Sequence, residues 1–209
     1  MNFSRRLARL RLIRPIWRLA DHVFDSDDPW QAAVARVPQE VYGAGHLQDF
    51  AWYLQGHSKV VVRSLDELCA WLLACEYVSD MELFNVADFW QHPVTFEELR
   101  KGDCEDFSLW AWRKARDLGI PAEFISGSTL NADRSARAGH AWVLLHLPDG
   151  PHILEGVYRD RKHMIRPLVD VAHEYEPHAS VDHNLEGRLY SGYVRYLQRR
   201  RLRLRSSDA

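Results

Sequence analysis

A cysteine begins the strongest predicted helix in the middle of the chain. Gly102 and Asp103 form a turn, Cys104 opens the helix, and Gly119 stands where a left-handed residue ends one, with Pro121 preventing continuation. The unpaired N–H groups of a first helical turn and the positive end of the helix dipole stabilise a thiolate. Cys104 is therefore a candidate nucleophile for attack on an acyl carbon.

A base and a cation are needed beside this thiol, because Glu105 and Asp106 would raise its pKa. Two β-rich runs, Gly139 to Leu147 and His152 to Tyr158, flank a turn of Pro, Asp, Gly and Pro. In an antiparallel hairpin about that turn, residues whose numbers add to about 295 to 297 lie opposite one another. His140 and Glu155 satisfy this condition. The glutamate would orient the imidazole and stabilise the imidazolium, which supplies the cation.

The elements that position these residues indicate an α+β fold, with the helix of Cys104 packed on a mostly antiparallel sheet. Length and composition favour a single domain over residues 1–209, with a core of about 60–160. The patterns predict strands at 59–63 and 122–127, a polar loop at 128–138, and helices at 3–20, 64–78, 95–100 and from 190 onward. Cys69 and Cys75 lie on different faces of one of these helices and are expected to be structural.

Composition limits the class of protein. The chain has three cysteines without paired spacing, which predicts neither a disulfide framework nor a zinc site. It has no run of eighteen apolar residues, and its arginine-rich start lacks the apolar stretch of a secretory signal. We therefore expect a cytoplasmic protein without an integral membrane segment. The sequence leaves the oligomeric state open.

Charge is distributed unevenly along the chain. Residues 1–20 hold six arginines and residues 188–207 hold seven, with no acid in either segment, while the middle is acidic. Such basic ends suit an anionic partner, either nucleic acid or a membrane surface. They equally suit folding back on the acidic body, and the helical spacing of Leu7, Leu10, Ile13 and Trp17 favours that interpretation.

Several local motifs resemble those of the transglutaminase-like superfamily, and most closely the bacterial transglutaminase-like cysteine proteases. The resemblance covers about residues 60–160 and is carried by four segments. These are Asp88-Phe89-Trp90-Gln91 with Pro93, Gly102-Asp103-Cys104-Glu105-Asp106, Leu118-Gly119-Ile120-Pro121, and Gly139-His140-Ala141-Trp142-Val143 followed by Ile153-Leu154-Glu155.

The resemblance implies a catalytic triad of Cys104, His140 and Glu155, acting on a protein or peptide substrate without a cofactor or metal. It also implies oxyanion stabilisation or substrate positioning by residues just upstream, for which Gln91, Trp90 and Asp103 are the candidates. A Cys104 thioester formed from a glutamine or peptide amide would be resolved by water or by an amine. Protease, deamidase and transglutaminase activities therefore all remain open.

Two other interpretations come from different classes of protein. A metal enzyme would use the histidines at 163, 173, 178 and 183, but their spacing matches no familiar ligand pattern. A catalytically degenerate binding module would keep the fold and use its basic ends for binding. Glu155 is the reason to consider this binding module, since the family generally has aspartate at that position.

Overall fold

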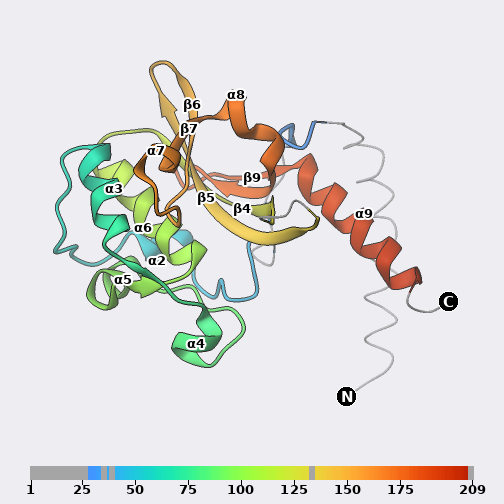
Figure 1. Cartoon of the computed structure of the whole chain (residues 1–209), viewed down its shortest axis with the longest axis horizontal. Coiled ribbons are helices and arrows are strands. Elements are labelled where there is room, and N and C mark those ends of the chain that lie inside the picture. The colour runs from blue at the N-terminus through green and yellow to red at the C-terminus, as the bar shows by residue number, and fades with distance from the viewer. Residues whose placement is uncertain (1–27, 34–36, 38–40, 132–134, 207–209) are drawn as a thin grey trace.

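A seven-stranded antiparallel sheet forms the centre of the structure, a computed structural model that describes residues 28–33, 37, 41–131 and 135–206 (Figure 1). Its strands, in spatial order, are β1 (Ala32–Ala33), β9 (Gly187–Tyr190), β8 (Tyr175–Val181), β4 (Ala122–Leu130), β5 (Arg137–Leu147), β6 (Gly150–Leu154) and β7 (Ile165–Pro167). Helices cover both faces of this sheet. The predicted α+β class is confirmed.

The helix of Cys104 is the main packing partner of the sheet. This helix, α6 (Cys104–Asp117), is buried along almost its whole length and ends as predicted, with Gly119 at a φ of 72°. The Trp112 indole donates to Ala122 O at 3.2 Å, and the Ser108 hydroxyl donates to Ala141 O at 2.9 Å. These two bonds fix α6 against β4 and β5, so that the start of the helix lies beside the start of β5.

The remaining helices surround this core. On the side of α6 the chain forms α2 (Phe50–Tyr53), α3 (Leu65–Leu73), α4 (Asp80–Phe84), α5 (Pro93–Leu99) and the short parallel strand pair β2 (Glu76–Tyr77) and β3 (Lys101–Gly102). After the hairpin come α7 (Arg161–Met164), α8 (Leu168–Val171) and the 3-10 turn η2 (Ala172–Glu174). Val171 of α8 packs with Ile125, Trp142 and Ile153 on the face opposite α6.

The hairpin follows the predicted register. Val143 pairs with Leu154 and Leu147 pairs with Gly150, so paired residue numbers add to 297. Strand pairing of β5 with β6 stops at Leu154, which places Glu155 just beyond the paired part of the hairpin. The predicted strand to Tyr158 is therefore too long.

Three further predictions differ from the structure. The helix predicted at 64–78 ends at Leu73, and Glu76–Tyr77 form strand β2. Much of the predicted polar loop at 128–138 is strand, because β4 continues to Leu130 and pairs with both β5 and β8. Residues 59–63 are not a strand. Their polar groups bind side chains instead, since Lys114 Nζ donates to Val60 O at 2.6 Å and Glu97 accepts from Lys59 N at 3.0 Å.

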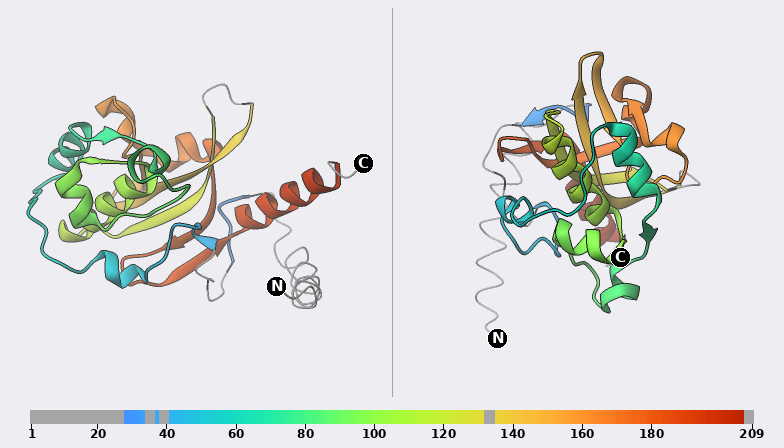
Figure 2. Two further views of the ribbon diagram at one scale, coloured as in Figure 1. Left: turned by 90° about the horizontal axis from the view of Figure 1, so that it is seen from below. Right: turned by 90° about the vertical axis from the view of Figure 1, so that its left-hand side faces the viewer.

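The last helix, α9 (Ser191–Ser206), confirms the predicted helix from about residue 190 and extends away from the sheet (Figure 2). Buried Glu176 of β8 binds its Arg199, with one bond at 2.9 Å between Nη1 and Oε2. The predicted helix at 3–20 lies outside the described residues.

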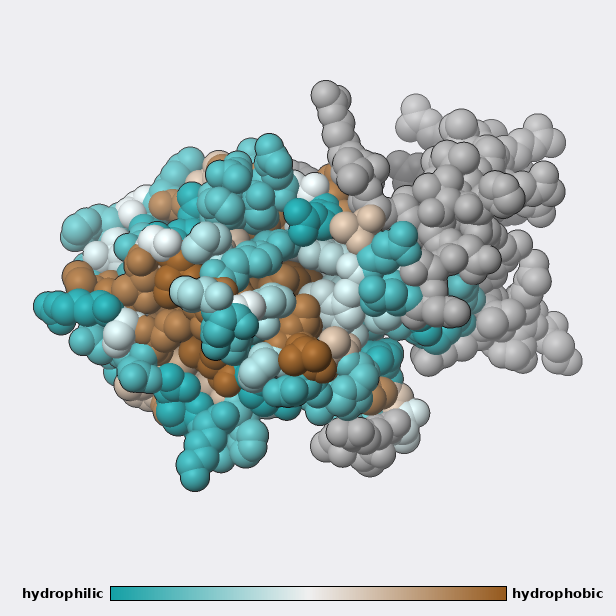
Figure 3. All heavy atoms as spheres, turned by 90° about the horizontal axis from the view of Figure 1, so that it is seen from above, coloured by the Kyte–Doolittle hydropathy of each residue, from teal (hydrophilic) through white to brown (hydrophobic). Residues whose placement is uncertain are grey.

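One face of the molecule carries apolar side chains over its middle, ringed by hydrophilic side chains (Figure 3). This apolar surface does not amount to a membrane segment. Among the described residues, no helix combines the length and the apolar character that crossing a membrane requires.

Candidate active site

Cys104 lies at the first position of α6, after the N-cap residue Asp103. Its side chain is partly buried, and Sγ donates a hydrogen bond to Glu105 Oε2 at 3.2 Å. The backbone N–H of Ala141 also donates to the sulfur. Since Ala141 follows His140 in β5, this contact brings the start of α6 against the strand that carries the predicted base.

His140 and Glu155 are hydrogen-bonded, with 2.9 Å between Nε2 and Oε2. The Glu155 side chain is only 1 % exposed, so its carboxylate is held in a low-dielectric setting. Burial lowers the pKa of His140, but the charge and hydrogen bond of Glu155 outweigh burial, and the net pKa of His140 is raised. With Nε2 bound to Glu155, Nδ1 is the nitrogen left to exchange a proton with a thiol.

A second partner fixes the carboxylate of Glu155. The Tyr175 hydroxyl donates to the same Oε2 at 3.1 Å, and Arg166 in turn donates to the Tyr175 oxygen at 3.1 Å. Hydrogen bonds thus run from Arg166 through Tyr175 and Glu155 to His140. Sequence reasoning missed Tyr175, because it comes from β8, which is two strands away from β5 in the sheet.

The pKa of Cys104 is raised well above its ordinary value. Burial is the main cause, and the carboxyl groups of Glu105 and Asp103 add to it. These effects outweigh the Ala141 bond and the start of the helix. The thiol is therefore neutral in this arrangement, and a thiolate forms only when another group accepts its proton.

A cavity of about 390 Å³ joins the predicted residues. Cys104, His140, Trp90 and Asp103 all line this space, which we call the Cys104 cavity. Glu155 does not line it and lies behind the His140 ring, on the side of a second cavity. Cys104 and His140, the predicted nucleophile and base, thus line one solvent-accessible space, while Glu155 is buried.

Gln91 is placed differently from the other predicted residues. It is almost fully buried and is not among the residues that line the Cys104 cavity. Its Nε2 donates to Lys101 O at 3.0 Å and to Asp106 Oδ2, and its backbone N–H donates to Asp106 Oδ1 at 2.8 Å. The amide therefore fixes the start of α6 and does not point at an acyl oxygen near Cys104.

Carboxyl groups crowd one side of the Cys104 cavity. Burial, with the neighbouring Asp103 adding to it, raises the pKa of Glu105 to about 11. Burial likewise raises the pKa of Asp80 to about 6. Oxygen ligands of this kind suit a hard divalent cation such as Ca²⁺ or Mg²⁺.

Within the described residues, three sets of side chains have ligand atoms within 4.8 Å of one another. They are Asp80, Asp88 and Glu105; Asp80, Asp103 and Asp106; and Asp103, Cys104 and Glu105. None of these sets includes the histidines at 163, 173, 178 or 183, which the metal-enzyme alternative would need, so the structure does not bring them together as ligands in its described part.

Comparisons with known proteins give one family match and several similar solved structures. Residues 54–153 match the model of the transglutaminase-like superfamily. Among solved structures, Legionella pneumophila LapG is similar at 19 % identity and a TM-score of 0.46, over 85 % of this chain and 87 % of that one. Its calcium-bound form is similar at 21 % identity and a TM-score of 0.44, over 62 % and 71 % of the two chains. A search of curated proteins found no match.

Proposed function

Because residues 54–153 carry a core of the transglutaminase-like superfamily, which supports a thiol enzyme in general, we propose that the chain is a cysteine acyl-transfer enzyme acting on protein or peptide amides. Cys104 is the nucleophile, His140 the base and Glu155 the residue that orients the base. The observation that carries the proposal is the meeting of Cys104 and His140 at one cavity, with Glu155 hydrogen-bonded behind the imidazole.

The reaction begins when His140 Nδ1 takes the thiol proton and Sγ attacks the amide carbon, forming a C–S bond and a tetrahedral oxyanion. The C–N bond then breaks as His140 returns the proton to the departing nitrogen, leaving a thioester. Water or an amine attacks the thioester, His140 takes its proton, and the C–S bond breaks as the proton passes to the sulfur. Glu155 keeps its hydrogen bond to His140 Nε2 throughout and stabilises the imidazolium.

The raised pKa of Cys104 supports this order of events. A neutral thiol is a weak nucleophile, so proton transfer to His140 must accompany attack. The raised pKa of His140 favours the imidazolium that results. The thiol and the imidazole therefore act as a proton-transfer pair with carboxyl groups close by.

Oxyanion stabilisation is assigned to the backbone N–H of Cys104, which lies in the first helical turn where such groups have no helical acceptor. Trp90 forms part of the wall, and its indole donates to Asp88 at 3.0 Å. Gln91 and Asp103 act as positioning residues, Gln91 through Asp106 and Asp103 as the cap of α6. Cytoplasmic location and an anionic partner for the basic ends stay predictions.

One experiment separates the possible reactions. Wild-type protein and Cys104→Ala are incubated with a proteome-derived peptide library and a small primary amine, and products are identified by mass spectrometry. New peptide ends indicate proteolysis, conversion of glutamine to glutamate indicates deamidation, and amine adducts indicate transamidation. Cys75→Ala is the matched control for loss of a thiol elsewhere. We expect products that require Cys104, and their complete absence would favour the binding-module alternative.

A further inference from the structure

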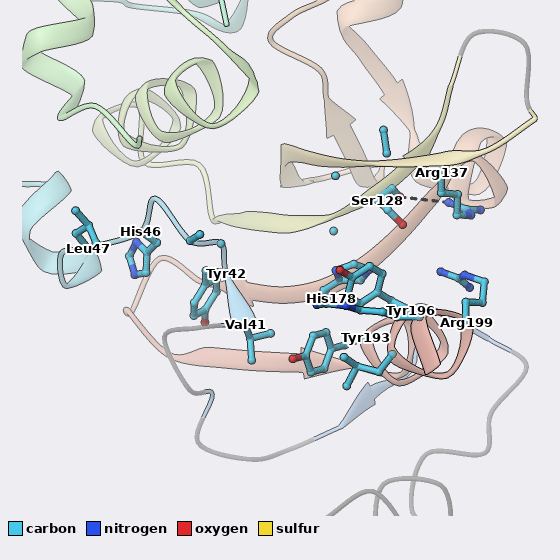
Figure 4. Close-up of a pocket in the computed structure, with 17 residues that line it drawn as sticks. Val41, Tyr42, His46, Leu47, Ser128, Arg137, His178, Tyr193, Tyr196 and Arg199 are labelled. Carbon is cyan, nitrogen blue, oxygen red and sulfur yellow. Dashed lines mark hydrogen bonds between the residues drawn. The ribbon is translucent and has the colours of Figure 1, made fainter. Parts of the chain in front are cut away.

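A second, larger cavity adjoins the Cys104 cavity. It has a volume of about 990 Å³, and α9 forms one of its walls, so we call it the α9 cavity (Figure 4). The two cavities share six lining residues: Val41, Tyr42, Gly43, Gly127, Gly139 and His178. They therefore form one continuous cleft that leads from the thiol to the last helix.

The two ends of this cleft differ in charge. Arg137, Arg199 and Arg200 line the α9 cavity, and no aspartate or glutamate is among the described residues that line it. The Cys104 cavity is the reverse, since four acidic residues and no lysine or arginine are among its described lining residues. The α9 end thus attracts carboxylates, while the Cys104 end repels them.

The buried carboxylate of Glu176 neutralises part of the positive charge of the α9 cavity, but not all of it. It contacts both Arg199 and Arg137, the latter with 3.9 Å between Nε and Oε2. Burial raises the pKa of Glu176, but bonds from His178 and Arg199 outweigh burial and hold the pKa at about 2. One carboxylate therefore faces two guanidinium groups, and Arg200 adds a third positive charge that has no acidic partner within the described part of the chain.

The shape of the cleft also suits an extended polypeptide. Gly139 lies between its two parts, one residue before His140, and a Cβ built there would meet nothing within 4 Å. A bare backbone at this point allows another chain to pass close to the sheet. The rings of Tyr196 and His178 are tilted against each other, with 4.7 Å between ring centroids, and both line the α9 cavity (Figure 4).

From these observations we propose that the α9 cavity binds an acidic segment of the polypeptide substrate, on one side of the amide that reacts with Cys104. The inference rests on the proposed function, since it names the substrate class of that same site. Aspartate or glutamate side chains of the substrate pair with Arg200 and with the Arg137–Arg199 pair. The substrate backbone crosses Gly139 to bring the reacting amide to the thiol.

Binding can be tested without chemistry by using Cys104→Ala protein. Two fluorescein-labelled peptides, one alternating glutamate with glycine and one alternating lysine with glycine, are compared by fluorescence anisotropy. We expect the acidic peptide to bind more tightly, and Arg200→Glu to weaken its binding by about tenfold. Arg63→Glu, the same charge change at an exposed site outside the cleft, should leave the affinity within about twofold.

A second variant distinguishes binding inside the cleft from electrostatic attraction of the peptide to the arginines of α9 alone. Gly139→Leu keeps every charge and places a side chain in the open space of the cleft, so it should abolish binding of the acidic peptide. Circular dichroism confirms that the variant is folded. Undiminished binding by Gly139→Leu, or equal affinity for the two peptides, overturns the proposal.

The proposed function is tested separately, because the peptide library measures products that require Cys104 and the anisotropy measures occupancy. Binding of the acidic peptide without any such product would refute the enzyme and leave the cleft assignment standing. Products that require Cys104, without selective binding of the acidic peptide, would support the enzyme and refute the assignment of the α9 cavity.

Discussion

The imidazole of His140 and the carboxylate of Glu155 meet just beyond the paired part of the β5–β6 hairpin, with Nε2 2.9 Å from Oε2. The strand register places His140 diagonal to Glu155, and the length of the glutamate side chain reaches across that offset. A glutamate at this position can therefore fix the orientation of the imidazole that we propose as the base.

Replacing Glu155 should affect the base more than the fold. In Glu155→Gln the charge that stabilises the imidazolium is lost, and we expect kcat to fall by about 10²- to 10⁴-fold. Glu155→Asp keeps the charge but retracts it, and should retain more activity than Glu155→Gln. The measurement is turnover of a peptide identified in the library experiment. Equal activity of Glu155→Gln and wild-type protein would remove Glu155 from the mechanism.

Removing the Tyr175 hydroxyl tests a positioning role. Tyr175→Phe deletes one hydrogen bond to Glu155 and leaves the ring in place. We expect kcat to fall by about tenfold with little change in KM, since one hydrogen bond to a charged group is worth about 1.5–3 kcal/mol. The acid limb of the pH profile should also move, because the charge on Glu155 controls His140. Tyr190→Phe, which removes a hydrogen bond of the same length to buried Glu123, is the matched control. A purely structural role for Tyr175 would leave the pH profile unchanged.

The charge of Asp103 should control the reactivity of the thiol. Asp103→Asn keeps a residue that caps helices well and removes a carboxylate that raises the pKa of both Cys104 and His140. Both pKa values should therefore fall, and the pH profile of Cys104 alkylation by iodoacetamide should shift by about one unit to lower pH. Peptide mass spectrometry identifies the alkylated cysteine. Asp149→Asn, an exposed aspartate on the hairpin turn, should cause no shift.

The contribution of Glu105 to the free energy of unfolding should fall as pH rises. Its pKa is about 11 in the folded chain, against about 4.3 for an unperturbed glutamate, so between these values the folded state holds a proton that the unfolded state has lost. The stabilisation from this proton is complete below pH 4 and declines above it. Glu123 and Glu176, with pKa values of about 2, contribute equally at pH 5 and pH 8 and do not obscure the effect.

The test is urea unfolding at pH 5 and pH 8, in the presence of EDTA so that no divalent cation occupies the carboxylates. We expect wild-type protein to be less stable at pH 8, and Glu105→Gln to reduce the difference by on the order of 1–2 kcal/mol. An unchanged difference between the two pH values would show that Glu105 is ionised in the folded state.

Two glycines of the cleft should differ in their tolerance of a methyl group. A Cβ at Gly127 would lie 2.4 Å from Glu176 O and 2.6 Å from the Trp142 ring, so Gly127→Ala should cost about 2 kcal/mol of stability. Gly139→Ala meets open space and should change stability by less than about 0.5 kcal/mol. Thermal unfolding of the two variants provides the comparison. Equal losses would contradict the close packing of Gly127 against Glu176 and Trp142.

Local patterns predicted the elements that hold the nucleophile and the base. The turn at Gly102 and the helix end at Gly119 placed α6, and the turn between β5 and β6 placed the hairpin register within two residues. These features depend on chemistry within a few positions of the chain. A single sequence is sufficient to recognise them.

Contacts between distant segments could not be predicted in the same way. Tyr175 reaches Glu155 only because β8 pairs with β4, a pairing for which the sequence offers no turn or register. The amide of Gln91 appeared available to an oxyanion, whereas the structure shows it bound to Asp106. The run at 59–63 resembled a strand because nothing in its sequence reveals that Lys114 Nζ donates a hydrogen bond to the carbonyl oxygen of Val60.

Helix α9 lines the larger cavity and is absent from the described lining of the Cys104 cavity, while α6 does the reverse. In the two proposals made above, bond making and substrate choice therefore lie on separate parts of the polypeptide. A relative could acquire a new target by exchanging its final helix without altering the reacting groups. For protein engineering, α9 is accordingly the segment to randomise when a different recognition sequence is wanted.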